Sequence, residues 1–478
     1  MEKSSYFAAL IVLFLLTIIN VSSSSTSRDL PKVICIETER EALLSFKKGL
    51  IDHSLPSWNE DNCCAWMGVQ CDNVTGHILQ LDLRSPYDYT YLGSRFGGEV
   101  NSALSELKQL NYLDLSLNNF GGILVPPFLG SLPNLKWLKL SRAGCVGGKS
   151  LRWATNLSSL QELDMSGLDL SNTSDWLQVI SMLPSLVVLH LSNCSLDKIH
   201  FLPNASFTSL LKLDLTHNQF TSLMPNSLYN LTRLVLLDLS YNRFRGPIHS
   251  SLNFFSSLER LYLSNNNFTG SLPKGIGLLS KLERSISHFP CNQMNKSYYL
   301  NIVNLSGNHF SGEFPPCWMD WPLLKLINME NNNLKGTIPS SVGSLVSLKS
   351  LNLRNNSLHG ELPSSMQNWT RLIMMHIGGN KFSGNIPTWM GKSFPDLRSL
   401  VLHSNKFDGA IPLELCHLTS LQILDLSHNH LSEAIPRCFN NLSAMTIPQN
   451  TCPLYRFHIS FRFDRKCIAG DKRNKAEI

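Results

Sequence analysis

The sequence lacks the signatures by which many enzymes are identified. Its 478 residues contain no Gly-x-Ser-x-Gly, no His-Glu-x-x-His and no phosphate-binding loop. Charged residues make up only 16% of the chain, and the net charge is +6. A net charge of this size does not indicate nucleic-acid binding. We therefore expect a protein that is not an enzyme, with no cofactor and no nucleic-acid partner.

Long apolar runs are absent after the N-terminus. Residues 1–25 carry Lys3, an apolar run from Ala8 to Ile19 and the small residues Ser22 to Ser25. This order predicts a secretory signal peptide. No later stretch reaches the about 18 apolar residues of a membrane-spanning helix, so we expect a chain in the secretory pathway without a membrane anchor of its own.

A repeat of 24 or 25 residues organises most of the chain. In LKSLNLRNNSLHGELP, leucines stand at Leu348, Leu351 and Leu353, followed by Asn356 and Gly360. The same pattern begins at fourteen positions: Ile78, Leu110, Leu135, Leu160, Leu186, Leu210, Leu234, Leu258, Leu300, Leu324, Leu348, Leu372, Leu397 and Leu421. A fixed period of this length indicates a leucine-rich repeat solenoid.

The pattern also predicts what each part of a turn does. The LxxLxL segment is a short half-buried strand that can bury its leucines only against neighbouring turns. The asparagine bonds the backbone where the chain leaves the strand. We expect a right-handed superhelix with a parallel sheet on the concave side, extended chain and short helical turns on the convex side, and repeats over residues 77–444.

The N-terminal segment, residues 26–76, has a different composition. Residues 37–50 have a helical apolar pattern, and four cysteines bracket them: Cys35, Cys63, Cys64 and Cys71. In a secreted chain such cysteines predict disulfides. A zinc site is the alternative, but the spacing lacks a matching Cys-x-x-Cys pair or a histidine partner, so we expect no metal. We interpret the segment as a cap on the exposed end of the solenoid.

Two motifs carry a family resemblance. Cys-Cys-x-Trp-x-Gly-Val-x-Cys (Cys63 to Cys71) followed by LxxLxLxxNxLxGxIPxxL resembles plant-type leucine-rich repeat extracellular proteins: receptor-like proteins, receptor-like kinases and polygalacturonase-inhibiting proteins. The phrase IPRCFNNLSAM (Ile435 to Met445) is similar to receptor-like proteins of the fungal-xylanase and leaf-mould receptor class. By this resemblance Cys35 pairs with Cys63 and Cys64 pairs with Cys71.

The resemblance implies a function. It favours the ligand-binding ectodomain of a defence or developmental receptor-like protein, located on the outer face of the plasma membrane and signalling through a co-receptor kinase. Its ligand would be a peptide or protein, for example one derived from a pathogen. The alternatives are a secreted inhibitor of a cell-wall-degrading enzyme, in the space outside the cell, and a non-functional truncated fragment.

Candidate ligand-binding residues are aromatic, basic and histidine side chains that point out of the concave face. Aromatic and arginine side chains are the usual anchors of binding surfaces. The candidates are Tyr112, Trp137, Lys139, Arg142, Tyr241, Arg260, Tyr262, Arg354, His376 and His403. Any single one of them can equally be a solvated residue of the sheet face. Acidic residues such as Asp114, Asp238 and Asp425 share one repeat position, and we interpret them as ordering the strand face.

Three further features depart from the regular repeat. Residues 282–299 lack a strand and an asparagine, so we expect the solenoid to kink or gape there, as after a deletion. Cys416 and Cys438 have nearly the same phase in adjacent turns, and strands about 4.8 Å apart would allow a disulfide. Residues 445–478 have no repeat, and we expect a disordered tail where the family continues into further repeats, a cap and a membrane helix.

Twelve Asn-x-Ser/Thr sequons indicate a glycosylated extracellular surface. They are Asn73, Asn156, Asn172, Asn193, Asn204, Asn230, Asn267, Asn295, Asn304, Asn355, Asn368 and Asn441. Asn230, Asn368 and Asn441 share a convex position, where glycans would leave the concave face free. Asn304 and Asn355 are expected on the concave side, where a glycan would limit ligand access.

Overall fold

The computed structural model describes residues 33–51, 55–85, 95–199, 209–225, 228, 231–248, 255, 257–272, 299–314, 318 and 321–445. The predicted signal peptide, the tail from residue 446 onward and residues 282–298 of the interruption lie outside this part of the chain. So do three of the sequons, Asn204, Asn230 and Asn295.

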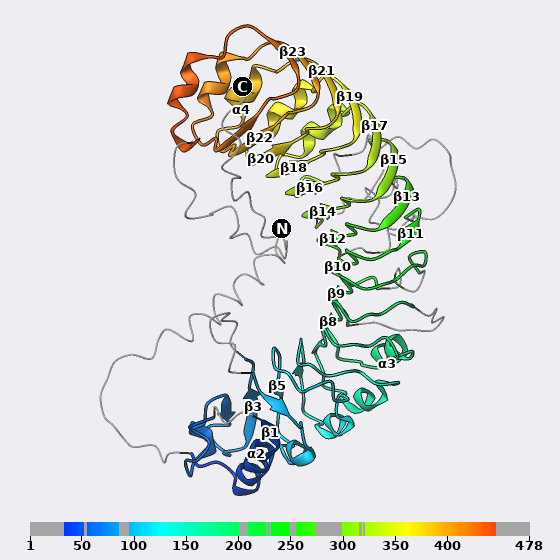
Figure 1. The fold of residues 1–478 in the computed structure, drawn as a ribbon, viewed down its shortest axis with the longest axis vertical. Coiled ribbons are helices and arrows are strands. Elements are labelled where there is room, and N and C mark those ends of the chain that lie inside the picture. The colour runs from blue at the N-terminus through cyan, green and yellow to red at the C-terminus, as the bar shows by residue number, and fades with distance from the viewer. Residues whose placement is uncertain are drawn as a thin grey trace, which may run out of the picture.

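A sheet of fifteen strands lines the concave side of an arc (Figure 1). Its first strand, β2, runs antiparallel to β3, and the other strands pair in parallel from one turn to the next. In register, Leu351 lies between Ile327 and Met375, and all three are buried. The strands are β2 (Val69–Cys71), β3 (Ile78–Asp82), β5 (Tyr112–Asp114), β6 (Trp137–Lys139), β7 (Glu162–Asp164), β8 (Val188–His190), β9 (Lys212–Asp214), β10 (Leu236–Asp238), β12 (Arg260–Tyr262), β14 (Ile302–Asn304), β16 (Leu326–Asn328), β18 (Ser350–Asn352), β20 (Met374–His376), β22 (Ser399–Val401) and β24 (Ile423–Asp425).

A second parallel sheet follows the outer edge of the arc from β11 onward (Figure 1). Its strands come from the segment before the proline of each turn, where a glycine such as Gly360 (φ 82°) adopts a backbone conformation that other residues rarely adopt. The sequence did not predict this sheet. Its eight strands are β11 (Arg245–Gly246), β13 (Asn267–Ser271), β15 (His309–Glu313), β17 (Asn333–Gly336), β19 (Ser357–Gly360), β21 (Lys381–Asn385), β23 (Lys406–Ala410) and β25 (His430–Ser432).

Short helices return the chain to the next strand. Most of them are single 3-10 turns, as expected for a segment that follows proline. They include η2 (Ser102–Glu106), η3 (Pro127–Ser131), η4 (Arg152–Asn156), η9 (Ser340–Ser344), η10 (Ser364–Asn368), η11 (Leu413–His417), η12 (Arg437–Asn441) and η13 (Ser443–Met445), with the α-helices α3 (Trp176–Ser181) and α4 (Trp389–Ser393). The predicted leucine-rich repeat solenoid with a concave parallel sheet is confirmed. No helix in the described part of the chain is long and apolar enough to cross a membrane.

Buried asparagines join consecutive turns below the concave strands. The side chain of Asn332 donates to the carbonyls of Leu305 (3.0 Å) and Met329 (3.1 Å) and accepts from the N–H of Phe310 (3.0 Å). Two turns later, Asn380 makes the equivalent bonds: it donates to the carbonyls of Leu353 and Ile377 and accepts from the N–H of Leu358. Each amide thereby satisfies backbone groups of two turns that would otherwise be buried without partners.

The sheet continues across the interruption, so the predicted kink or gap is wrong. β12 pairs directly with β14, with Leu261 opposite Val303. The asparagine ladder is also unbroken, because Asn308 bonds the carbonyl of Leu263 and accepts from the N–H of Phe268. The turn that begins at Leu300 has a complete strand, β14, and its own asparagine, Asn308. Because this turn is complete, β14 pairs directly with β12 and needs no strand from residues 282–299 between them.

An N-terminal cap covers the first turn. The helix α2 (Glu37–Gly49) buries Ala42, Leu43 and Phe46, and Glu39 accepts from the backbone N–H of Ile78 in β3 (2.7 Å). The strand β1 (Leu50–Ile51) pairs with β4 (Gly97–Gly98), and the 3-10 turn η1 (Cys63–Ala65) carries two of the cysteines. The cap is therefore attached to the solenoid by apolar burial and by a buried carboxylate.

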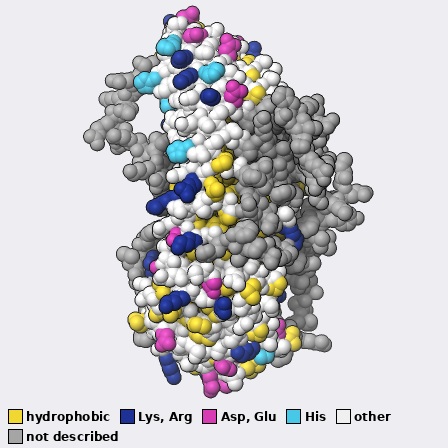
Figure 2. Space-filling model, turned by 90° about the vertical axis from the view of Figure 1, so that its right-hand side faces the viewer, with side chains coloured by type: hydrophobic (Ala, Val, Ile, Leu, Met, Phe, Trp, Pro, Cys, Tyr) yellow, Lys and Arg dark blue, Asp and Glu magenta, His cyan; other side chains and the backbone are white. Residues whose placement is uncertain are grey.

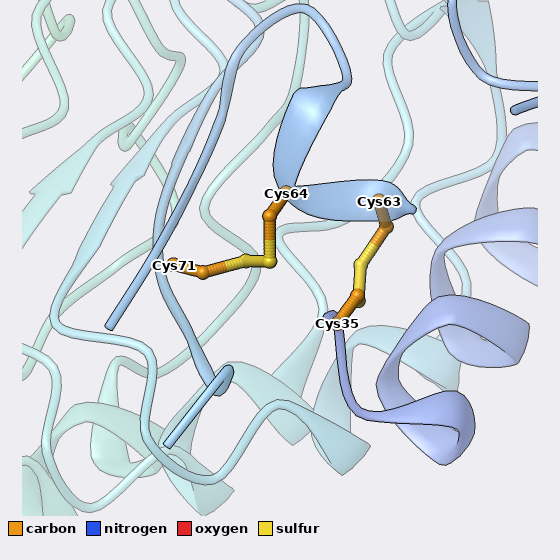
Figure 3. Close-up of side chains that lie close together, drawn as sticks. All are labelled: Cys35, Cys63, Cys64 and Cys71. Atoms are coloured by element: carbon orange, nitrogen blue, oxygen red, sulfur yellow. A yellow bond between two sulfur atoms is a disulfide. The ribbon is translucent and has the colours of Figure 1, made fainter. Parts of the chain in front are cut away.

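Three disulfides lie near the ends of the described chain, two in the N-terminal cap and one in the last turns. Cys35 bonds Cys63, and Cys64 bonds Cys71 (Figure 3). In the last turns Cys416 bonds Cys438, with Cα atoms 5.8 Å apart. This separation is within the range that a disulfide can span.

Candidate ligand-binding surface

The concave face contains a hollow with a volume of about 700 Å³. Residues that follow or end the strands from β5 to β16 line it. Three of the predicted candidates are among them: Arg142, Tyr241 and Tyr262. Tyr262 is only 8% exposed and forms part of the floor, whereas Tyr241 is 45% exposed and stands at the surface.

Acidic side chains and one histidine form a row through this hollow. Parallel pairing places Asp164 beside His190, His190 beside Asp214, and Asp214 beside Asp238. Because adjacent strands lie about 4.8 Å apart, these side chains are neighbours across the sheet. From its repeat position, Asp238 was expected only to order the strand face. The row of neighbouring side chains was not predicted, although the shared repeat position of these residues was the available signal.

These aspartates do order the strand face. One oxygen of Asp238 accepts from the backbone N–H of Ser240 (3.0 Å), and Asp164 and Asp214 bond the residue two positions on in the same way. The predicted ordering role is therefore confirmed for these positions. Asparagine does the same at Asn304, where the acceptor oxygen bonds the N–H of Ser306, so the negative charge is not required for this bond.

His190 and Asp214 are coupled in the hollow. His190 Nδ1 lies 3.5 Å from Asp214 Oδ2. Burial alone would lower the pKa of His190, but the hydrogen bond to Asp214 and the nearby carboxylates outweigh burial and raise it. Burial would likewise raise the pKa of Asp214, but hydrogen bonds from His190 and Thr216 outweigh it and lower that pKa.

Among the residues that the structure describes, no histidine or other cation pairs with Asp238. Burial, together with the negative charge of Asp214, raises the pKa of Asp238 to about 7. The folded state therefore binds a proton at Asp238 more tightly than the unfolded chain does. The stability that this proton supplies is fully present below the unfolded pKa and is lost as the pH rises through about 7.

We expect Asp238→Asn to remove this pH dependence. The wild-type protein should lose stability between pH 5 and pH 8 relative to the variant, by about 1–3 kcal/mol in the free energy of unfolding. Asparagine keeps the bond to Ser240, as Asn304 shows for its own turn. Urea unfolding across this pH range measures the difference, with Asp408→Asn on the outer sheet as the control for loss of an exposed carboxylate. A parallel pH profile for Asp238→Asn and wild type would contradict the account.

Bulky side chains occupy strained backbone positions at the surface of the hollow. From β5 to β24, each described turn leaves its strand through a residue with positive φ, and asparagine fills that position at Asn193, Asn265, Asn331 and Asn355. Tyr241 (φ 56°) and Arg142 (φ 52°) stand there instead. The ring of Tyr241 stacks on His217 with centroids 4.2 Å apart. Residues that favour this conformation poorly are a signal of a functional surface.

A second group of candidates lies toward the cap. The rings of Tyr112 and Trp137 are 6.4 Å apart, and Lys139 Nζ lies 5.8 Å from the centre of the Tyr112 ring. Lys139 also pairs with Glu162 at 3.1 Å. The structure thus brings three predicted residues together on β5 and β6. Arg260, on β12, belongs to neither this group nor the lining of the hollow.

The third group lies toward the C-terminal end. Arg354 follows β18, His376 ends β20 and His403 follows β22. Burial, together with the nearby positive charges of Arg354 and His403, lowers the pKa of His376 to about 4. His376 is therefore neutral at neutral and mildly acidic pH, whereas Arg354 has a full positive charge.

The outer edge of the arc, formed by the second sheet, carries charged side chains that are exposed to solvent. Figure 2 shows this side, with Lys, Arg and His side chains spread over its upper half together with several Asp and Glu side chains. Lys381 and Lys406, on β21 and β23, are exposed there. They provide a comparison surface for the concave face.

The cap cysteines form the only group in the described residues whose atoms are close enough to share a metal ion. The sulfur atoms of Cys35, Cys63, Cys64 and Cys71 all lie within 4.8 Å of one another. All four are paired as disulfides (Figure 3). Metal binding requires the thiolate, so the bridged cysteines do not fit a zinc site.

One predicted glycosylation site, Asn304, is buried in the structure. Asn304 is only 4% exposed, and its side-chain oxygen is bonded within the sheet, so a glycan there would need the folded strand to move. The other sequons in the described residues are exposed: Asn73, Asn156, Asn172, Asn193, Asn267, Asn355, Asn368 and Asn441. They remain predicted glycosylation sites, with Asn193 and Asn355 at the edge of the concave face.

Family comparisons agree with the repeat architecture. The leucine rich repeat N-terminal domain family matches residues 36–72. Leucine rich repeat families match residues 183–244 and six single repeats: 257–279, 299–321, 323–345, 347–369, 396–418 and 420–442.

Receptor-like proteins of plants are similar in sequence. Receptor-like protein EIX1 of Solanum lycopersicum is 36% identical over 240 residues, which are 42% of this chain and 23% of that protein. Receptor-like protein EIX2 of the same species is 32% identical over 246 residues, 44% of this chain and 24% of that protein. Receptor-like protein Cf-9 of Solanum pimpinellifolium is 31% identical over 208 residues, 36% of this chain and 22% of that protein. The matches span about a quarter of the length of these relatives.

Solved structures show the same fold. A TDR receptor has a TM-score of 0.57 at 24% identity, covering 78% of this chain and 67% of that one. The Leptospira interrogans leucine-rich repeat protein LIC12759 has a TM-score of 0.52 at 25% identity, covering 76% and 82%. These likenesses concern the architecture of the solenoid.

Proposed function

Because the chain belongs to the leucine-rich repeat proteins, with plant receptor-like proteins as its sequence relatives, we propose that its concave face recognises an extracellular peptide or protein ligand. The hollow beside Tyr241 and His217 carries this proposal. It combines a recessed surface, stacked aromatic side chains and bulky residues at strained positions. Aromatic anchors of this kind dominate binding energy in protein interfaces.

The finer parts of the proposal follow from the relatives. The chain would act as the ectodomain of a receptor-like protein at the cell surface, in defence or development. It would bind a ligand without catalysis and signal through a co-receptor kinase. The similarity of residues 435–445 to receptor-like proteins of the fungal-xylanase and leaf-mould receptor class supports a ligand derived from a pathogen.

A paired capture experiment tests the proposal. The glycosylated protein is immobilised and exposed to extracellular fluid from leaves, with and without fungal culture filtrate, and the bound molecules are identified by mass spectrometry. The variant His217→Asn/Tyr241→Asn removes the stacked rings. It keeps a residue that occupies the same backbone conformation in other turns. Recovery of the bound ligand should fall at least tenfold, since the loss of aromatic anchors typically costs more than about 1.4 kcal/mol.

The matched control changes the outer edge. Lys381→Ala/Lys406→Ala alters two exposed residues on β21 and β23 and should leave recovery unchanged. Equal recovery by wild type and the concave variant would contradict the proposal. Recovery of a cell-wall-degrading enzyme in place of a peptide or elicitor would favour the secreted inhibitor.

A further inference from the structure

The central hollow of the concave face carries more negative than positive charge. Among the described residues that line it, five are carboxylates and Arg142 is the only lysine or arginine. Two of the carboxylates have a cation beside them. Glu162 lies 3.1 Å from Lys139, and Glu330 lies 3.9 Å from Arg354. The other three belong to the row across the sheet: Asp164, Asp214 and Asp238.

Two side chains of this row respond to the same negative potential. The carboxylates around His190, together with its hydrogen bond to Asp214, raise the pKa of the imidazole in spite of burial. Burial and the negative charge of Asp214 raise the pKa of Asp238. A recessed surface lined by charges of one sign concentrates their field. The hollow therefore favours a positively charged group of a ligand.

A strip of aliphatic side chains occupies the same three turns, which carry β8, β9 and β10. The residue after the first leucine of these turns is Val187, Leu211 and Val235. The backbone N–H of Leu211 donates to the carbonyl of Val187 (2.9 Å), and that of Val235 donates to the carbonyl of Leu211 (2.8 Å). All three side chains are half-buried. The turns on either side have Gln161 and Glu259 at this position, so the strip leaves apolar surface open where its neighbours are polar.

Val188 and Leu236 connect the strip to the row. Val188 stands two residues before His190 on β8, and both are half-buried. Leu236 stands in the same relation to Asp238 on β10. Alternate residues of a strand point to the same face of the sheet, so these aliphatic side chains lie beside the row on the concave face. Lys212 occupies the equivalent position on β9, is exposed and does not line the hollow.

We propose that the hollow is a subsite for an arginine or lysine side chain of the ligand, and that the strip of Val187, Leu211 and Val235 takes an aliphatic side chain beside it. A carboxylate accepts several hydrogen bonds, so the aspartates can bind the N–H groups of the cation and keep their bonds within the turns. Such charge-assisted bonds are stronger than neutral ones. This inference rests on the proposed recognition of a peptide or protein ligand and specifies the side chains at its centre.

Two dipeptides of closely similar shape and different charge test the subsite. N-acetyl-leucyl-arginine amide and its uncharged counterpart N-acetyl-leucyl-citrulline amide are titrated into the glycosylated protein, labelled with ¹³C at the histidine rings. Ionic strength is constant and the pH is above 7, where Asp238 is ionised. The variant His190→Gln assigns the signal of His190. We expect a saturable shift of this signal with the arginine peptide, and an affinity about tenfold higher than for the citrulline peptide.

Asp164→Asn/Asp214→Asn should abolish this preference for arginine. Asparagine stands at the same repeat position at Asn304 and bonds the backbone in the same way, so the variant keeps the order of its turns. Asp425→Asn is the matched control. Asp425 makes the equivalent bond, to the N–H of Ser427, but lies outside the hollow, so its loss should leave the preference unchanged. A preference that survives in Asp164→Asn/Asp214→Asn would overturn the subsite.

Leu211→Gln tests the strip without altering a charge, and the turn of Gln161 shows that glutamine fits this position. The variant should bind N-acetyl-leucyl-arginine amide several-fold more weakly and N-acetyl-glycyl-arginine amide as the wild type does. Unchanged affinity for the leucyl peptide would contradict the role of the strip. Equal affinity of the wild type for the arginine and citrulline peptides, or no saturable shift with the arginine peptide, would reject the cation subsite.

The dipeptide result is separate from ligand capture. If the dipeptides show no preference while capture still depends on His217 and Tyr241, the concave face recognises its ligand without this subsite. If the arginine preference is present and capture is insensitive to those two residues, the subsite stands and the proposed role of the stacked rings fails.

Discussion

Phe268→Ala should lower the free energy of unfolding by about 3–5 kcal/mol, the usual cost of emptying a buried phenylalanine site. Phe268 is fully buried in a stack with Phe244 and Phe310, at centroid distances of 6.0 and 6.1 Å. Its N–H also donates to Asn308 across the interruption. Because each turn of a solenoid contacts only its neighbours, this residue couples the turns before the interruption to those after it.

Urea unfolding followed by hydrogen exchange measures this effect. In the variant, the turns around β12 and β14 should lose protection first, and unfolding should separate into two transitions. Thr269→Ala, at an exposed neighbouring residue of β13, is the control and should change stability little. A single transition with a loss below about 1 kcal/mol would show that the contact across the interruption does not couple the two parts.

Removing the first cap disulfide should have the second largest effect. Cys35→Ala/Cys63→Ala opens a loop of 28 residues and should cost about 2–4 kcal/mol. The reason is that this bridge holds the start of α2, whose residues Leu43 and Phe46 are fully buried against the first turn. Thermal unfolding of the intact glycoprotein measures the loss.

The second bridge provides an internal comparison. Cys64→Ala/Cys71→Ala opens a loop of only 7 residues, so the entropic cost should be about 1 kcal/mol smaller. If the short-loop variant were the less stable of the two, loop entropy would not be the main contribution of these bridges.

The repeat period determined most of the architecture in advance. Leucines at matched positions can be buried only by stacking, so the fourteen repeats predicted the rungs of the concave sheet from β3 to β24. The second sheet was not predictable from one turn. Its strands, such as β19 and β21, contain glycine and polar residues and form only because neighbouring turns already lie in register.

Two features could not be predicted from the sequence: the continuous sheet across residues 282–299 and the neighbours of each side chain on the concave face. The short step of 18 residues between Leu282 and Leu300 suggested that a strand was missing from the sheet. Strand pairing, however, depends on whether the following turn is complete, and the turn that begins at Leu300 is complete. The aromatic and basic candidate residues could be identified individually from the sequence. The row of Asp164, His190, Asp214 and Asp238 required the register between turns, and burial raised the pKa of Asp238 in a way that composition does not indicate.

Hydroxyl-radical footprinting of the protein with its captured ligand tests the central claim most directly. The proposed recognition predicts protection of the concave side chains Trp137, His217 and Tyr241, with His309 and His359 on the outer sheet oxidised as in the free protein. Protection confined to the outer sheet, with Tyr241 and His217 still fully reactive, would contradict recognition by the concave face.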